Sequence, residues 1–162
     1  MNKHIIFLLM SIFLLGWVSS LAYSNYSVQD LEQPYSGFSA DEIMSPSDHI
    51  PEEDIYVLND RVIIKIKDPK WASFTDTNSM DPIIDINSNS IEIKPQSTKD
   101  IEPGDIISYK YQDLGLIIHR VIKTGYDEQG WFAITKGDNN IFRDPSKVRF
   151  EQVNGVVIGV IY

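Results

Sequence analysis

The chain contains no cysteine, which excludes disulfide bonds, thiolate metal sites and a cysteine nucleophile. Basic residues are also few: the chain has 14 lysines and arginines and 23 aspartates and glutamates, which gives a formal net charge of -9. A surface of this charge repels phosphate backbones, and no basic stripe offsets it, so we predict no nucleic-acid partner. Histidine occurs only as His4, His49 and His119, which narrows the choice of a neutral-pH general base.

Long helical patterns are absent beyond residue 22, and the sequence has no internal repeat. Runs of β-branched residues stand there instead, each bounded by turn-forming residues. The clearest run is 61–67, and further strands are predicted at 90–93, 105–111, 116–123, 130–135 and 153–161. Because sequential strands commonly pair as hairpins, and 43% of the residues are hydrophobic, we predict an all-β domain with a packed core.

One long apolar run occupies residues 5–22, directly after Lys3 and His4. As a helix it would rise roughly 27 Å, which nearly matches the hydrocarbon core of a bilayer. The basic residue precedes the run and acidic residues follow it, so the positive-inside bias predicts a cytoplasmic N-terminus and an extracytoplasmic domain. A cleaved signal peptide is the alternative, since small residues that a processing enzyme accepts lie near the end of the run: Ser19, Ser20 and Ala22.

These patterns divide the chain into three parts. Residues 1–22 are predicted to be an N-terminal membrane anchor or a signal peptide, 23–54 a polar acidic linker, and 55–162 a β-rich domain. An uncleaved anchor makes the protein single-pass in the cell membrane, with lipid as a partner. Either interpretation exports the domain.

Ser79 lies in a polar turn between apolar stretches. Serine and asparagine are ordinary turn residues, so the segment by itself indicates only a turn. A serine hydroxyl becomes a nucleophile when a base removes its proton and nearby donors hold the resulting oxyanion. The chain must therefore supply a base elsewhere.

His119 interrupts a β-branched run, where strand alternation places Ile117, His119 and Val121 on one face. A buried core histidine is the plain alternative. Because the other two histidines lie in the membrane flank and the predicted linker, a base within the domain is either His119 or a lysine whose pKa is lowered by burial. Lys123 and Lys136 are the lysine alternatives.

A third segment, residues 135–140, contains Gly137, Asp138 and Asn139, and Asp144 follows it. Gly-Asp-Asn after a strand is typical of a tight hairpin turn. Asp144 can also hold a histidine in the tautomer that a general base needs. We therefore expect one of the two acids to orient the base and the other to brace the loop.

Four sequence boxes, taken in order, resemble those of signal peptidase I. They are Ser79-Met80-Asp81-Pro82, Gly104-Asp105-Ile106-Ile107, His119-Arg120-Val121 and Lys136-Gly137-Asp138-Asn139-Asn140. The resemblance covers roughly residues 74–161. Where the bacterial branch has a lysine this chain has His119, so it is similar to the archaeal and endoplasmic-reticulum branch.

This resemblance implies a membrane-anchored serine endopeptidase that removes signal peptides from translocated preproteins and needs no cofactor or metal. It implies a signal-peptidase-type β-fold catalytic core behind one transmembrane helix, and it leaves room for a partner in the translocation machinery. Ser79 would be the nucleophile, His119 the general base, Asp144 its acidic partner and Asp138 a second acid of the site. The oxyanion and substrate-binding region would be formed by Thr77, Ser79, Met80 and Pro82.

The sequence departs from the family pattern around Ser79, where Thr77 stands at a position that is often serine in the family. Asn78 stands where a glycine usually precedes the nucleophile, which restricts the φ angles open to the turn. Ile83 and Ile84 replace a small residue and a threonine after Pro82. Two other hypotheses stay open: an inactive surface-anchored binding module with the same fold, and a calcium site built from Asp76, Asp81, Asp85, Asp138 and Asp144.

Overall fold

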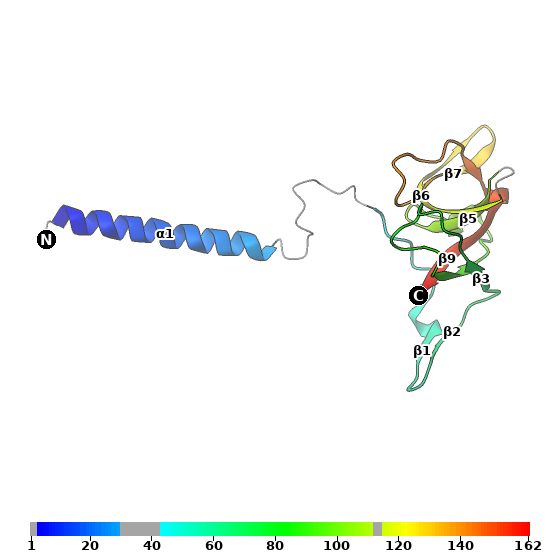
Figure 1. Cartoon of the computed structure of the whole chain (residues 1–162), viewed down its shortest axis with the longest axis horizontal. Helices are drawn as coiled ribbons and strands as arrows, with labels where there is room; N and C mark the ends of the chain where they lie inside the picture. The colour runs from blue at the N-terminus through cyan, green and yellow to red at the C-terminus, as the bar shows by residue number, and fades with distance from the viewer. Residues whose placement is uncertain (1–2, 30–42, 112–114) are drawn as a thin grey trace. The chain divides into compact units, whose positions relative to one another are not determined.

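The computed structural model describes residues 3–29, 43–111 and 115–162. The chain divides into two compact units, Met1–Asp41 and Glu42–Tyr162 (Figure 1). Each unit has its own secondary structure. The first contains the helix and the second contains the sheets, so they are treated separately below.

The first unit contains helix α1, Lys3–Gln29. Its segment Lys3–Ser20 is long and apolar enough to cross a membrane, a property that signal sequences share. The helix continues beyond residue 22, so the start of the predicted linker lies inside it. Residues 23–29 contain no proline or glycine, and nothing in the local sequence therefore interrupts the helical hydrogen bonds.

The second unit consists of antiparallel sheets. Within the described residues, a two-stranded sheet pairs β1 (Ile55–Val57) with β2 (Val62–Ile64), and a seven-stranded sheet has the order β3-β4-β9-β5-β6-β7-β8. The all-β core behind one N-terminal helix is confirmed. The bounds of the large sheet are β3 (Lys70–Ser73), β4 (Asn89–Ile93), β5 (Ile106–Lys110), β6 (Leu116–Asp127), β7 (Gly130–Lys136), β8 (Val148–Arg149) and β9 (Val153–Ile161). Short 3-10 helices lie at Glu52–Asp54, Thr98–Asp100 and Phe150–Gln152.

The large sheet is buried on both faces near its centre. Strand β9, red in Figure 1, lies between β4 and β5. On one face Ile107 and Tyr109 of β5 pack in a cluster with Val121, and on the other Ile106 packs with Met80. Because successive side chains of a strand point to opposite faces, one strand contributes to both cores.

The pairing of β5 with β6 determines the face of the sheet on which the His119 side chain lies. Ile107 pairs with His119 and Tyr109 with Ile117, which confirms the predicted alternation along the first half of β6. The register then shifts between Val121 and Lys123, where β6 pairs with β7. Such an irregularity breaks the alternation of side chains between the two faces of the sheet. The spacing of Lys123 from His119 therefore does not place the two side chains on the same face.

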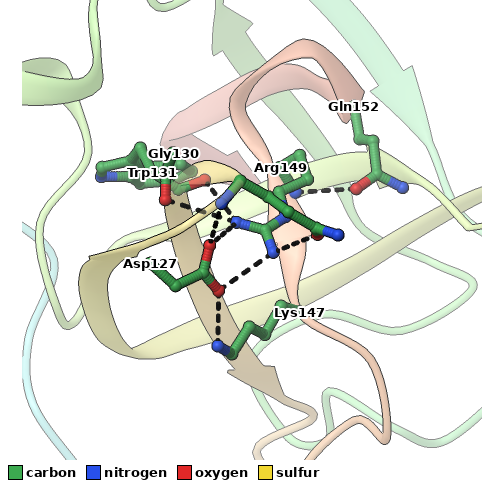
Figure 2. Close-up of polar contacts among 7 residues, drawn as sticks. Asp127, Gly130, Trp131, Lys147, Arg149 and Gln152 are labelled. Carbon is green, nitrogen blue, oxygen red and sulfur yellow. Dashed lines mark hydrogen bonds and ion pairs between the residues drawn. The ribbon is translucent and has the colours of Figure 1, made fainter.

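The far end of the β6–β7 hairpin is tied to β8 by charged groups (Figure 2). Asp127 accepts hydrogen bonds from Lys147 at 2.6 Å and from Arg149 at 2.8 and 3.0 Å. These bonds, the one from Arg149 first, hold the pKa of the Asp127 carboxyl well below its usual range. Arg149 also donates to the carbonyl oxygens of Gly130 and Trp131, so one side chain closes the hairpin end.

Residues 43–50 pack with the β unit, although the sequence predicts a linker there. The Asp105 carboxylate is fully buried and accepts the backbone N–H of Ser47 at 2.8 Å and the backbone N–H of Glu102 at 2.8 Å. His49 Nε2 lies 3.1 Å from the same carboxylate. Asp105 therefore binds this segment to the start of β5, an association that local polarity does not reveal.

The His49–Asp105 pair predicts a pH-dependent stability. The hydrogen bond to Asp105 raises the pKa of His49 above its ordinary value of 6.5, against the effect of burial. The protonated pair therefore contributes stability that is complete below pH 6.5 and is lost as the pH rises through the higher, folded-state pKa. We expect the thermal midpoint to fall between about pH 6 and about pH 8.5 in the wild type, and to fall less in His49→Gln, as measured by circular dichroism. An equal slope in both proteins would contradict this account.

Candidate active site

Ser79 and His119 line the same cavity. It has a volume of about 420 Å³ and lies between the segment that follows β3 and the first half of β6. Thr77, Met80 and Asn140 line it as well, together with apolar side chains from both segments. Three of the four sequence boxes therefore meet at one cavity, through Ser79, His119 and Asn140, although these residues are far apart in the sequence.

Backbone contacts fix the turn that carries Ser79. Asn78 has a φ of 55°, in the left-handed region, which asparagine adopts more readily than most residues. The glycine that the family usually has at this position could adopt the same positive φ. Asn78 is therefore compatible with the turn. The Asn139 backbone N–H donates to the Ser79 carbonyl at 3.0 Å, and its side chain donates to the Asn78 carbonyl at 2.9 Å.

Gly137 allows this close approach of the two loops. A Cβ added to Gly137 would lie 2.5 Å from the Ser79 carbonyl oxygen, well inside contact distance. Only glycine therefore fits at this position without moving the turn. The Gly-Asp-Asn-Asn segment acts as the support for the serine turn in this fold.

The Ser79 hydroxyl is half-buried and lies 3.2 Å from Thr77 Oγ1. In the part of the chain that the structure describes, it makes no hydrogen bond to the His119 ring. Thr77 is thus the residue that contacts the predicted nucleophile directly. A hydroxyl in this position can donate to an oxyanion that forms beside Ser79.

Asp144 holds the His119 ring. His119 Nδ1 lies 2.8 and 3.0 Å from the two carboxylate oxygens, and the histidine is 6% exposed. The carboxylate also accepts hydrogen bonds from Tyr109 at 2.7 Å and from Thr135 at 2.6 Å. Burial raises the pKa of Asp144, but the hydrogen bonds from His119, Thr135 and Tyr109 outweigh it and lower the pKa below its usual value.

These contacts determine the tautomer of the histidine. An ionised carboxylate only accepts hydrogen bonds, so Nδ1 carries the proton and Nε2 of the neutral ring is free to accept one. Tyr109 stays a donor because burial raises the pKa of its hydroxyl well above the ordinary value. The arrangement leaves His119 Nε2 without a contact to Asp144, as a general base would require.

Asp138 has a different partner. Its carboxylate accepts two hydrogen bonds from Arg120, at 2.8 and 2.7 Å, and both side chains are almost fully buried. Arg120 also donates to the carbonyl oxygens of Gly104 and Met44, at 2.8 and 3.1 Å. The pair joins the loop under Ser79 to β6 and to residues 43–50, so Asp138 positions the site without contacting His119.

No family model, curated protein or solved structure matches this chain. The relation to signal peptidase I therefore stays a hypothesis, based on the four sequence boxes and on the geometry described above.

The remaining predicted residues lie as follows. Met80 is 2% exposed and its sulfur accepts the Asp138 N–H at 3.4 Å, so it contributes to the core as well as to the cavity. Pro82 is exposed and does not line the cavity, which makes it a turn residue in this structure. Lys123 is exposed, and neither it nor Lys136 lines the cavity. Neither lysine therefore lies in the cavity beside Ser79, where a general base would have to be.

The carboxylates of the calcium hypothesis do not assemble. Asp138 is engaged by Arg120 and Asp144 by His119, and the described residues contain no group of three or more acidic or histidine side chains that could hold a metal ion. A calcium ion needs six or more oxygen ligands around one point. The aspartates of the calcium hypothesis therefore do not surround a common point.

Breaking the buried Arg120–Asp138 pair is expected to destabilise the fold. Asp138→Asn leaves a buried guanidinium without its countercharge, which costs about 3 to 5 kcal/mol in comparable pairs. Chemical denaturation of the isolated variant measures this loss. A double variant, Arg120→Met with Asp138→Leu, is the control, because it removes both charges and should recover most of the stability. An Asp138→Asn protein as stable as the wild type would contradict the role assigned to the pair.

Proposed function

We propose that this chain is a membrane-anchored serine endopeptidase that removes signal peptides from translocated preproteins. The observation that carries the proposal is the shared cavity of Ser79 and His119, with Asp144 bound to the opposite nitrogen of the histidine ring. A nucleophile, a base and an orienting acid are the three groups that acyl transfer by serine requires. The four sequence boxes support the same reaction class.

In the proposed reaction, Ser79 Oγ attacks the scissile carbonyl and its proton passes to His119 Nε2. The oxyanion forms beside Thr77, whose hydroxyl is already within 3.2 Å of Ser79 Oγ. His119 then gives the proton to the leaving amine, and the signal peptide remains attached to Ser79 as an ester. A water molecule, deprotonated by His119, hydrolyses the ester and restores the serine.

The first half of β6 provides an edge on which an extended substrate can bind. Leu116 to His119 pair with β5 on one side, whereas β7 pairs with β6 only from Arg120 onward. Within the described residues, the other edge of this segment is therefore open, and it borders the cavity. A peptide that adds there as a strand gains backbone hydrogen bonds and directs alternate side chains into the cavity.

Helix α1 supports a location in the cell membrane. In the proposal its N-terminus is cytoplasmic and the catalytic domain is extracytoplasmic, where translocated preproteins emerge. Confining enzyme and substrate to one membrane raises their effective concentration. Small residues at the first and third positions before the cut are what the family resemblance implies for the substrate.

The test is cleavage of a preprotein with an Ala-x-Ala site by the full chain in lipid. We expect a single cut directly after the second alanine, identified by the masses of the two products. An intact preprotein, with the enzyme folded and embedded, would contradict the proposal and favour an inactive binding module.

A further inference from the structure

A buried carboxylate lines the cavity that contains Ser79 and His119. Glu92, on β4, is 2% exposed, and Ser108 of β5 and Asn154 of β9 line the cavity with it. The strand order places β9 between β4 and β5, so these polar side chains come from three neighbouring strands. The proposed reaction uses none of them, and their presence in the substrate cavity therefore needs a separate explanation.

The contacts of Glu92 are hydroxyl groups rather than a cation. Ser108 Oγ donates to Glu92 Oε2 at 2.7 Å, and Ser90 Oγ lies 3.5 Å from the other carboxylate oxygen. Asn154 donates to Ser108 at 3.3 Å and in turn accepts from Lys70 at the surface. Among the described residues, no lysine, arginine or histidine forms an ion pair with Glu92.

The backbone leaves space for this carboxylate. A Cβ on Gly155 would overlap Glu92 Oε2 and approach its Cβ to 3.0 Å. Any other residue at position 155 would therefore displace the glutamate. The carboxylate occupies a fitted position in the sheet.

Apolar side chains line the cavity beside these polar groups. Its apolar lining includes Phe74, Met80, Ile84 and Ile118. A carboxylate out of water with only hydroxyl partners is costly, and a bound cation would offset that cost. Lysine combines an apolar stem, which suits these side chains, with an ammonium group, which suits the carboxylate.

We propose that Glu92 determines substrate specificity by binding a basic side chain, lysine in the first instance, of the segment that precedes the cut. This inference rests on the proposed peptidase function and adds a substrate class to it. A site with a buried polar group rejects substrates that leave the group unpaired, so a neutral side chain of equal length should bind less well. The small residues implied by the family resemblance occupy other positions of the segment.

Peptide binding to the full Ser79→Ala chain in lipid tests the assignment, because binding is then measured without cleavage. The probes are peptides with an Ala-x-Ala site in which lysine, norleucine or glutamate replaces one residue at a time before the cut. At one position we expect lysine to bind about tenfold more tightly than norleucine, and glutamate to bind more weakly than both. The comparison among peptides needs no substitution at Glu92.

The lysine preference should disappear when Glu92→Gln is added to Ser79→Ala. Glu128→Gln is the matched control, because Glu128 is exposed and does not line the cavity. Equal binding of lysine and norleucine at every position, or a preference that survives Glu92→Gln, would overturn the assignment. If the wild type cleaves preproteins without this preference, only the specificity assignment fails; if it cleaves none, the peptidase proposal fails independently.

Discussion

His119→Ala is expected to lower kcat for preprotein cleavage by about a million-fold, the loss seen when a triad histidine is removed from a serine peptidase. Without Nε2, the described residues that line the cavity include no other histidine and no lysine to take the proton of Ser79 and return it to the leaving amine. Single-turnover cleavage by the variant, at matched folded concentration, measures the loss. The site geometry makes this substitution the most damaging one that leaves the nucleophile in place.

Added imidazole provides the control for His119→Ala. The substitution removes a ring next to an open cavity, so free imidazole can enter and restore part of the activity. Lys123→Ala and Lys136→Ala should change kcat by less than about threefold, because neither lysine lines the cavity. Strong activity in His119→Ala would contradict His119 as the base, and loss of activity in one of the lysine variants would favour that lysine instead.

Asp144→Asn is expected to lower kcat by about 10⁴-fold, as the equivalent change does in serine peptidase triads. The asparagine amide can donate to Nδ1, which would place the ring proton on Nε2 and leave the base unable to accept from Ser79. The 2.8 Å contact between His119 and Asp144 is the structural basis of this expectation. Steady-state cleavage with the folded variant measures the effect.

Tyr109→Phe is the matched control for Asp144→Asn. It removes one hydrogen bond to the Asp144 carboxylate and leaves the bonds from His119 and Thr135 in place. We expect a loss of about tenfold or less, since the ring orientation is kept. Equal losses in the two variants, or full activity in Asp144→Asn, would contradict the role of Asp144 in setting the tautomer.

The longer strands rich in β-branched residues are predictable from this sequence, whereas β1, β3 and β8 are missed. Strand β1 has β-branched residues but is only three residues long. The predicted runs correspond to β2, β4, β5, β6, β7 and β9, because valine and isoleucine fit a pleated, half-buried surface. Strand β3 is Lys70-Trp71-Ala72-Ser73, which has no β-branched residue, and β8 has only two residues. Both form by pairing with a neighbouring strand, which is tertiary information. Residues 43–50 join the β unit through the buried Asp105, whose partners are distant in the sequence.

Some residues of the candidate site can be predicted from the sequence, and others are found only from the fold. Ser79, His119 and Asp144 can be chosen from the order of the boxes, but only the fold shows that Ser79 and His119 share a cavity and that Asp144 reaches Nδ1. Tyr109 and Glu92 have no signal of their own in the sequence, and Arg120 is marked only by its place in the box His119-Arg120-Val121. Tyr109 lies two residues after Ile107, the partner of His119, so a correct strand register would have brought it near the site. Glu92 looks like a polar residue on the solvent side of a strand, whereas β9 and β5 bury it.

The most direct test of the central claim compares preprotein cleavage by the wild type and by Ser79→Ala, both as full chains in lipid. Ser146→Ala, at an exposed serine outside the cavity, is the matched control. The account predicts that the wild type and Ser146→Ala cut after the Ala-x-Ala site, and that Ser79→Ala yields no product. Equal cleavage by Ser79→Ala and the wild type would contradict the assignment of Ser79 as the nucleophile.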